Sequence, residues 1–382
     1  MKFTNNLPAV ILMITCLSVK SQDKSVSSFR DNLTRNDIEK VLKAVADWQI
    51  RTPLTHHSAD WTNAALYAGM VQWAGIAGDD SYYEWLRGKA EENSWSYKKP
   101  DDPLGRYHAD DYCVGQTYIE LCRKYKDVKM IEPVKAHLDN ILNDPADGSL
   151  EFIYSDKYWP TQRWAWCDAL FMGPTVWAKM AIVTGEKKYL DFMFQEYKAT
   201  TDYLYDKGEH LYYRDSRYFD MREANGLKVF WGRGNGWVFA GLPVILRELP
   251  SGYEHKDYFV KIYKEMAVKI LSLQTPDGFW HASLLDPASY PNPEMSATAF
   301  FVYGFAWGIN NGYLDKETYL PAIIKGWKSM VANVDPDGKV GYIQPIGADP
   351  KAVTKEMTEV YGVGGFLMAG TEITKLIDNG IL

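Results

Sequence analysis

Two kinds of helical pattern alternate along the chain. Residues 64–74 carry no charged side chain, and a helix that is apolar on every side has to be buried all round. The next segment, residues 81–92, places large apolar side chains on one face and charges on the other, as a helix of an outer layer does. Later helical segments repeat this alternation, at 111–125, 134–142, 168–183 and 189–203. The pattern therefore predicts helices in an inner and an outer layer, beginning with a first helix at 37–48.

Turns built on Asp and Gly follow several of these segments, at 147–148, 206–208, 277–278 and 337–338. Each turn precedes a short aromatic stretch that suits a brief extended segment. Repetition of helix, turn and aromatic segment indicates a ring of helical hairpins, and segments of roughly 28 residues give about twelve helices. We therefore expect an all-α fold, an (α/α)6 barrel with short β-hairpin-like loops at one end. A solenoid of helical repeats is the structural alternative.

The N-terminus has the pattern of an export signal. Residues 7–19 are mostly apolar and are followed by Ser21, which with Val19 forms a small-residue cleavage pattern. We expect residues 1–21 to be a signal peptide, and the protein to be exported by a bacterium to the periplasm or the medium. Lipidation at Cys16 is an alternative with a poor recognition sequence. No linker interrupts residues 22–382, which we expect to form a single catalytic domain without a membrane span.

Composition narrows the choice of partner. The 14 Trp and 26 Tyr residues suit stacking on sugar rings, although core packing uses most aromatic side chains in any protein. The net charge of −7 argues against nucleic acid. Cleavage of the signal peptide leaves three cysteines (Cys113, Cys122 and Cys167), and neither they nor the seven His residues show metal-ligand spacing. We expect a monomer without a metal or another cofactor.

Asp168 is the first candidate for chemistry. It is the one charged residue between Arg163 and Lys179, among large apolar side chains. A carboxyl group in such surroundings is costly to ionise, so its pKa is expected to rise toward values useful for a general acid. The alternative is a helix N-cap, because Asp168 also stands directly before a predicted helix.

Two adjacent carboxylates, Asp110 and Asp111, stand at the start of the apolar-rich segment 111–125, which precedes Asp168 in the chain. Carboxylates at the head of a buried helix can cap it and can also line a pocket. We expect Asp111 to point inward, because it begins its helix as Asp168 begins its own. Asp110 in that position is the alternative.

A glycine-rich segment at 230–237 contains Trp231, Arg233 and Trp237. Its three alternating glycines would let the backbone approach a ligand closely, and Arg233 can pair with a carboxylate as a planar fork. The spacing does not match a dinucleotide-binding loop. The structural alternative is a turn in which Arg233 caps a helix. Arg214 and other basic residues upstream suggest an anionic ligand.

Three motifs follow one another along the chain. They are Trp166-x-Asp168-x-Leu170-Phe171-Met172, Trp231-Gly232-Arg233-x-x-Gly236-Trp237, and Ser296-x-Thr298-Ala299 with residues 306–312. In this order they resemble the motifs of the unsaturated rhamnogalacturonyl hydrolases, glycoside hydrolase family 105. The resemblance extends over nearly the whole chain after the signal peptide.

The resemblance implies an (α/α)6 barrel that removes the Δ4,5-unsaturated uronic acid left by polysaccharide lyases at the non-reducing end of oligosaccharides. It assigns Asp168 as the general acid/base and Asp111 as the second active-site carboxylate. It assigns sugar binding to Trp166, Trp231, Arg233 and Trp237. Arg214 stands in a loop where several family members carry His. Together with Asp110 it completes the expected substrate contacts.

The chemistry of such a substrate fits one acid/base. An enol ether needs a proton at C4 and a water at C5, after which the hemiketal collapses and releases the aglycone. An inverting glycosidase that uses Asp168 and Asp111 is the first alternative. A glycan-binding protein without catalysis is the second. The sequence does not distinguish rhamnogalacturonan, arabinogalactan and ulvan as the parent polysaccharide.

Overall fold

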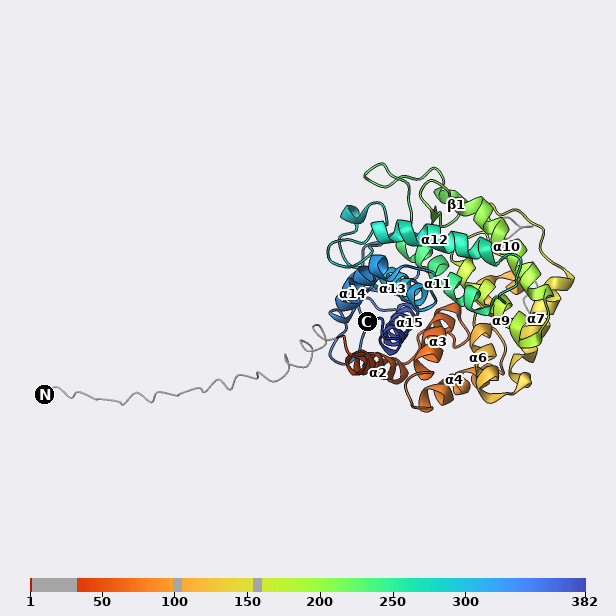
Figure 1. Cartoon of the computed structure of the whole chain (residues 1–382), viewed down its shortest axis with the longest axis horizontal. Helices are drawn as coiled ribbons and strands as arrows, with labels where there is room; N and C mark the ends of the chain where they lie inside the picture. Colours follow the sequence, from red (N-terminus) through yellow and green to blue (C-terminus); the bar gives the residue numbers. More distant parts are fainter. Residues whose placement is uncertain (2–32, 99–104, 154–159) are drawn as a thin grey trace.

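The structure is a computed structural model that describes residues 1, 33–98, 105–153 and 160–382. Twelve long helices of this described part alternate between an inner and an outer ring (Figure 1). The inner ring contains α3 (Trp61–Ala74), α6 (Gly115–Tyr125), α9 (Pro174–Thr184), α11 (Gly232–Glu248), α13 (Met295–Asn310) and α15 (Val360–Asp378). The outer ring contains α2 (Arg35–Arg51), α4 (Ser81–Glu92), α7 (Glu132–Asn143), α10 (Lys188–Leu204), α12 (Lys256–Ser272) and α14 (Lys316–Val331).

The ring is closed, because α15 packs against α3. This contact between the last and first inner helices confirms the (α/α)6 barrel and excludes an open solenoid. The predicted signal peptide and Cys16 lie outside the described residues. No helix within the described ranges is long and apolar enough to cross a membrane.

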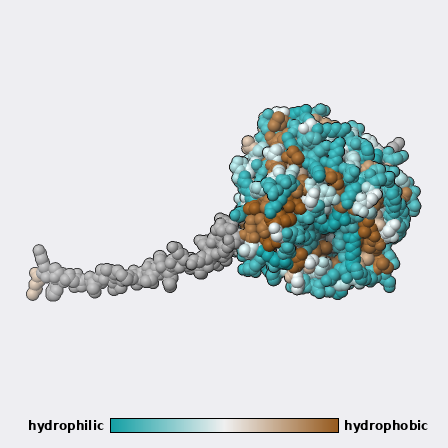
Figure 2. Space-filling view, viewed as in Figure 1, coloured by the Kyte–Doolittle hydropathy of each residue, from teal (hydrophilic) through white to brown (hydrophobic). Residues whose placement is uncertain are grey.

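The two rings differ in burial as their sequence patterns predict. Helix α13 is buried at every position from Met295 to Ile309, whereas α14 buries one face and exposes charged residues on the other. The face of the molecule seen in Figure 2 is accordingly mostly hydrophilic, with separate apolar areas. Burial of apolar side chains in the inner helices stabilises the fold.

Two expected inner helices are each divided in the structure. A one-turn helix, α5 (Ala109–Tyr112), precedes α6, and α8 (Ala169–Met172) precedes α9. Helix α9 begins at Pro174, which suits the first turn of a helix because its missing N–H would have no intrahelical acceptor there. The short helices reorient the chain just before the inner helices start.

Short elements complete the connections. They are the strands β1 (Tyr205–Asp206) and β2 (Leu211–Tyr212) and the 3-10 helices η1 (Gly105–Tyr107), η2 (Val128–Ile131), η3 (Pro160–Gln162), η4 (Ser216–Tyr218) and η5 (Pro287–Ser289). The antiparallel pairing of β1 with β2 confirms the hairpin predicted around 206–208. Gly278 and Gly338 have φ values of +92° and +100°, the left-handed conformation expected of Gly in an Asp-Gly turn.

Candidate active site

Segments far apart in the sequence meet where the inner helices begin. The backbone N–H of Cys167 donates to the carbonyl of Arg214 at 2.8 Å, which joins the chain before α8 to the loop after β2. The first turn of α11 packs against the same place, because a Cβ atom at Gly234 would lie 3.0 Å from the Cys167 sulfur. The chain before α8, the loop after β2 and the first turn of α11 thus pack together around Asp168.

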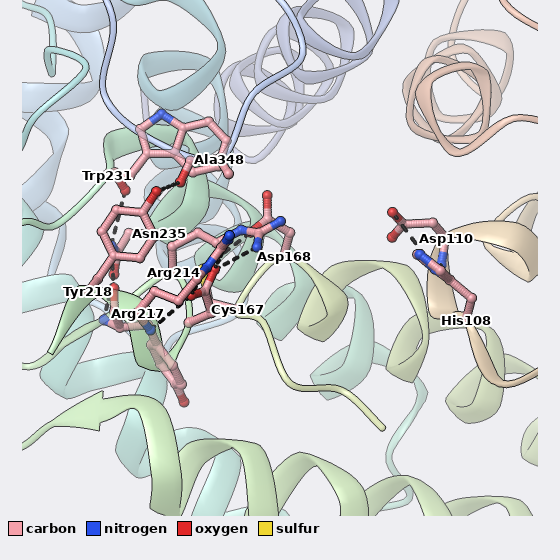
Figure 3. Close-up of polar contacts among 12 residues, drawn as sticks. His108, Asp110, Cys167, Asp168, Arg214, Arg217, Tyr218, Trp231, Asn235 and Ala348 are labelled. Carbon is pink, nitrogen blue, oxygen red and sulfur yellow. Dashed lines mark hydrogen bonds and ion pairs between the residues drawn. The ribbon is translucent and has the colours of Figure 1, made fainter. Parts of the chain in front are cut away.

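Asp168 is almost completely buried, with 8% of its surface exposed. Burial raises the pKa of Asp168 above its ordinary value, while the positive charges of Arg214 and Arg233 oppose that rise. The Nε atom of Arg214 lies 3.7 Å from Oδ2 of Asp168, and the Cys167 thiol donates to the same oxygen at 3.4 Å (Figure 3). The side chain of Asp168 makes no capping hydrogen bond to the backbone of α8. Asp168 thus stands at the N-cap position of α8, as the alternative predicted, but its side chain does not cap the helix.

Asp110 is the carboxylate that faces Asp168. Figure 3 shows its side chain directed toward Asp168 from the opposite side of the view. Its Oδ1 atom is buried and has no hydrogen-bond partner. Burial, and next the negative charge of Asp168, raise the pKa of Asp110 well above its ordinary value.

The premise that favoured Asp111 is wrong. The N-cap of α5 is His108, whose side chain accepts a hydrogen bond from the N–H of Asp110, so Asp111 lies inside the short helix and not at its head. Asp111 is half-buried, and its predicted catalytic role stays a prediction. The alternative in which Asp110 points inward fits the structure.

Arg214 is held by a carboxylate that the sequence analysis did not single out. Nη1 of Arg214 donates to Oδ2 of the fully buried Asp215 at 2.6 Å, and Arg217 donates to both oxygens of Asp215 at 2.8 Å. Although burial alone would raise the pKa of Asp215, hydrogen bonds from Arg217 and Arg214 keep it below its ordinary value. Two guanidinium groups thus share one carboxylate, which leaves positive charge beside Asp168.

The two arginines also share one aromatic surface. Their guanidinium carbons lie 4.9 Å (Arg214) and 4.4 Å (Arg217) from the ring centroid of Phe152. The Nε atom of Arg214 is buried and has no hydrogen-bond partner. Arg214 is therefore rigidly placed and keeps hydrogen-bonding capacity beside Asp168. The alternation Arg214-Asp215-Ser216-Arg217 was the sequence signal for this ion cluster.

Arg233 is 1% exposed and lies between two rings, 4.5 Å from the centroid of Trp231 and 4.8 Å from that of Tyr361. Its Nη1 donates to the carbonyl of Gln344 and its Nη2 to the carbonyl of Pro345 at 2.9 Å. It therefore does not cap a helix, and its fork holds backbone instead of a carboxylate. Its contribution to Asp168 is electrostatic, and a direct contact with substrate stays a prediction.

The predicted sugar-binding tryptophans have little free surface. Trp166 and Trp231 are each 2% exposed, and Trp237 is completely buried. Trp237 packs against Phe171 and Phe300 at centroid distances of 5.0 and 4.4 Å. A fully buried ring offers no face to a sugar, so Trp237 supports the site from within the core in this structure.

Trp61, which the sequence analysis did not select, is half-buried at the start of α3. It stacks on Tyr361 with a centroid distance of 5.4 Å and an interplanar angle of 18°. It also meets the edge of Trp237 at 6.1 Å. Trp61 is therefore an aromatic side chain of this cluster that retains surface for stacking.

The glycine-rich segment serves packing within the protein. It forms the first turn of α11, and a Cβ atom at Gly232 would lie 2.5 Å from the carbonyl oxygen of His281. The expectation that these glycines admit a ligand is thus replaced by a close approach of helix and loop. In the ranges that the structure describes, no cluster of three or more His, Cys, Asp or Glu side chains could hold a metal ion.

Comparison with known proteins connects this site with a family. The family model described as Glycosyl Hydrolase Family 88 matches residues 29–377. The unsaturated 3S-rhamnoglycuronyl hydrolase of Alteromonas sp. (strain LOR) is 35% identical, over 93% of this chain and 91% of the relative. The protein of the same name from Formosa agariphila is 36% identical, over 96% of this chain and 98% of the relative.

A solved structure of the same family also resembles this chain. The glycosyl hydrolase family 88 protein from Bacteroides vulgatus superposes with a TM-score of 0.80 at 29% identity, over 89% of this chain and 99% of that structure. The resemblance predicted from the three sequence motifs is confirmed. The chain belongs to glycosyl hydrolase family 88 and is a glycoside hydrolase of the unsaturated rhamnogalacturonyl hydrolase type.

Proposed function

We propose that this enzyme removes a Δ4,5-unsaturated uronic acid from the non-reducing end of lyase-generated oligosaccharides, and that Asp168 is its general acid/base. The observation that carries the proposal is the environment of Asp168. Its carboxyl group is buried, its pKa is raised by that burial, and it makes no structural capping bond. A buried carboxyl group with a raised pKa and no capping hydrogen bond is suited to proton transfer and does not stabilise a helix.

The reaction follows from the enol ether. Asp168 donates its proton to C4 of the double bond, and positive charge develops at C5 and the ring oxygen. Water then adds at C5 and loses a proton to the Asp168 carboxylate, which restores the resting enzyme. The hemiketal opens, and the resulting hemiacetal at C1 releases the aglycone. One carboxyl group thus serves both proton transfers.

The pKa of Asp110 favours this mechanism over an inverting glycosidase that would use Asp110 as its base. An inverting enzyme needs an ionised carboxylate as the base that activates water. The pKa of Asp110 is raised well above its ordinary value, first by burial and next by the charge of Asp168. A carboxyl group whose pKa is raised in this way is a poorer candidate for that ionised base than one with an ordinary pKa.

Arg214 supports an anionic substrate. Its guanidinium group lies beside Asp168, and Asp215 is already shared with Arg217. We therefore assign Arg214 to the uronate carboxylate. The names of the two relatives above favour 3-sulfated rhamnose as the sugar linked to the uronate.

Two assays test the proposal. The enzyme should abolish the ultraviolet absorbance of an unsaturated uronate linked to 3-sulfated rhamnose and should leave the saturated analogue intact. Hydrolysis of both at similar rates would favour the conventional glycosidase.

We also propose export by removal of residues 1–21, and a mature N-terminus at Gln22 by terminal sequencing would support that cleavage site.

A further inference from the structure

A cavity of about 290 Å³ lined by both charged and apolar residues lies at the opposite end of the barrel from Asp168. It is lined by the C-terminal parts of α3, α11 and α15 and by residues of α6 and α9. Arg247, one of its lining residues, follows Arg233 on the same helix by roughly 21 Å at 1.5 Å per residue. None of the residues around Asp168 described above lines this cavity.

Buried acceptors in the wall lack donors. Gln116 and Thr117 are each 1% exposed, and neither Oε1 of Gln116 nor Oγ1 of Thr117 has a hydrogen-bond partner. The amide nitrogen of Gln116 is used by the Cys113 sulfur at 3.3 Å, so the carbonyl oxygen is the free end of that side chain. Oε1 of Gln72 is likewise buried and unpaired. A buried polar atom without a partner is destabilising, so these atoms call for a hydrogen-bond donor.

The charges around the cavity do not cancel. Four cations are paired with only three carboxylates, as Arg123–Glu248, Lys179–Glu120, Lys375–Glu372 and Arg247–Glu372. Arg247 donates from Nη2 to Glu372 at 3.2 Å and also lies beside the hydroxyl group of Tyr303. Its side chain is 40% exposed, so part of the guanidinium group can be reached by a ligand.

The C-termini of the inner helices weaken the attraction of this excess positive charge for an anion. Helix C-termini carry partial negative charge, which offsets part of the excess and explains why cations gather there. Recognition of an anion therefore depends on direct N–H donors, above all those of Arg247, and not on long-range attraction. A charge-assisted hydrogen bond of this kind is directional and selective.

We propose that this cavity is a binding site for a small hydroxylated carboxylic acid of monosaccharide size, such as a hexuronate. The carboxylate accepts from Nε and Nη1 of Arg247, and the hydroxyl groups donate to Gln72, Gln116 and Thr117. A neutral sugar would give the remaining N–H groups of Arg247 no charged acceptor, and an inorganic oxyanion would leave the amide oxygens unpaired. The cavity volume lies at the lower end of the range for ligand pockets.

Calorimetric titration of the full chain with sodium D-glucuronate tests the site. Because glucuronate can also enter the site at Asp168, the titration is made in the Arg214→Met protein. One binding event should persist there, and D-glucose and sodium sulfate should each bind at least tenfold more weakly. Adding Arg247→Lys, which keeps the charge but removes Nε and Nη1, should weaken glucuronate at least tenfold. Adding Thr117→Val should weaken it about threefold or more.

Thr117→Val is also the control for folding. It is isosteric and removes an unpaired hydroxyl, so the fold should be retained, and kcat/KM in the background that keeps Arg214 should stay within twofold. The proposal is overturned if glucuronate gives no heat in Arg214→Met, or binds equally well after Arg247→Lys and Thr117→Val are added. It is also overturned if glucose or sulfate binds as tightly as glucuronate, since the cavity then holds water and ions without selectivity.

Discussion

The carboxylates at the two ends of the barrel have opposite environments. Where the inner helices begin, Asp168 lies 3.7 Å from Arg214, and Asp110 has a buried oxygen without a partner. Where they end, Glu120 is paired with Lys179 and Arg123. Burial raises the pKa at the first end, whereas at the second the two cations overcome burial and lower the pKa of Glu120. A carboxylate left short of partners retains a proton for chemistry, and a fully paired one stabilises the fold.

The largest difference between the two ends should appear in Asp168→Asn. Asn keeps the shape but cannot donate and regain a proton, so kcat should fall by about two to four orders of magnitude, the usual worth of a positioned acid/base. Because the Asp168 side chain makes no capping hydrogen bond, the melting temperature should change by no more than a few degrees. Absorbance assays and thermal unfolding measure the two effects. Activity above a tenth of wild type would transfer the role to Asp110 or Asp111.

Arg214→Met should have the next largest effect. Loss of a charge-assisted contact to the uronate should lower kcat/KM by about 1.5–3 kcal/mol, or roughly tenfold to more than a hundredfold. Arg217→Met is the matched control, because Arg217 binds the same Asp215 carboxylate but has no contact with Asp168. Equal losses in steady-state assays of both variants would mean that the arginines act only by shaping the loop.

At the other end of the barrel, Glu120→Gln should affect stability and not catalysis. It leaves the nearly buried Lys179 without a carboxylate, which should cost about 1–3 kcal/mol in the free energy of unfolding. Glu84→Gln, which breaks an exposed pair with Arg87, is the control and should cost less than about 1 kcal/mol. Denaturant unfolding measures both. A large loss of kcat in Glu120→Gln would contradict the separation of the two ends.

The smallest effect concerns the pH dependence of stability. The pKa of Asp110 is higher in the folded protein than in the unfolded chain, so between these two pKa values the folded state holds a proton that the unfolded chain releases. The free energy of unfolding therefore falls as pH rises through that range. Asp110→Asn should therefore gain stability at pH 7 relative to wild type and lose that gain at pH values of about 4 and below. Unfolding at both pH values, with Asp111→Asn as the neighbouring control, tests this. The same gain in Asp111→Asn would show that both carboxylates face inward.

Glu120 should show the opposite sign. Its folded pKa is lowered, so its contribution to stability is present above the ordinary glutamate pKa and is lost as pH falls. Glu120→Gln should accordingly cost most at neutral pH and little in acid. The two ends of the barrel thus give pH profiles of opposite slope.

The sequence predicted the layers well, because inner and outer helices differ in composition over whole turns, as α13 and α14 do. It also located Asp168 and Arg214, whose charges stand out against their neighbours. It failed where the outcome depends on the direction of one side chain. Asp110 and Asp111 are adjacent, and only the cap at His108 decides which of them faces Asp168.

Residues brought to the site by distant segments were also missed. Tyr361 lies on the last inner helix, yet it stacks on Trp61 of the first one. Nothing in either local sequence reports that closure of the ring brings the two together. Burial of Trp237 was missed for a related reason, since Phe171 and Phe300, which cover it, belong to other helices.

The position of the transferred proton tests the central claim most directly. When the reaction runs in D2O with an unsaturated uronate linked to rhamnose, protonation by Asp168 should place one deuterium at C4 of the released sugar. Mass spectrometry and proton NMR of that product measure it. Deuterium at C4 at the rate of aglycone release is the result predicted. Release of the aglycone ahead of deuterium uptake at C4, with the free unsaturated uronate as the first product, would contradict hydration of the double bond and favour direct hydrolysis at the anomeric carbon.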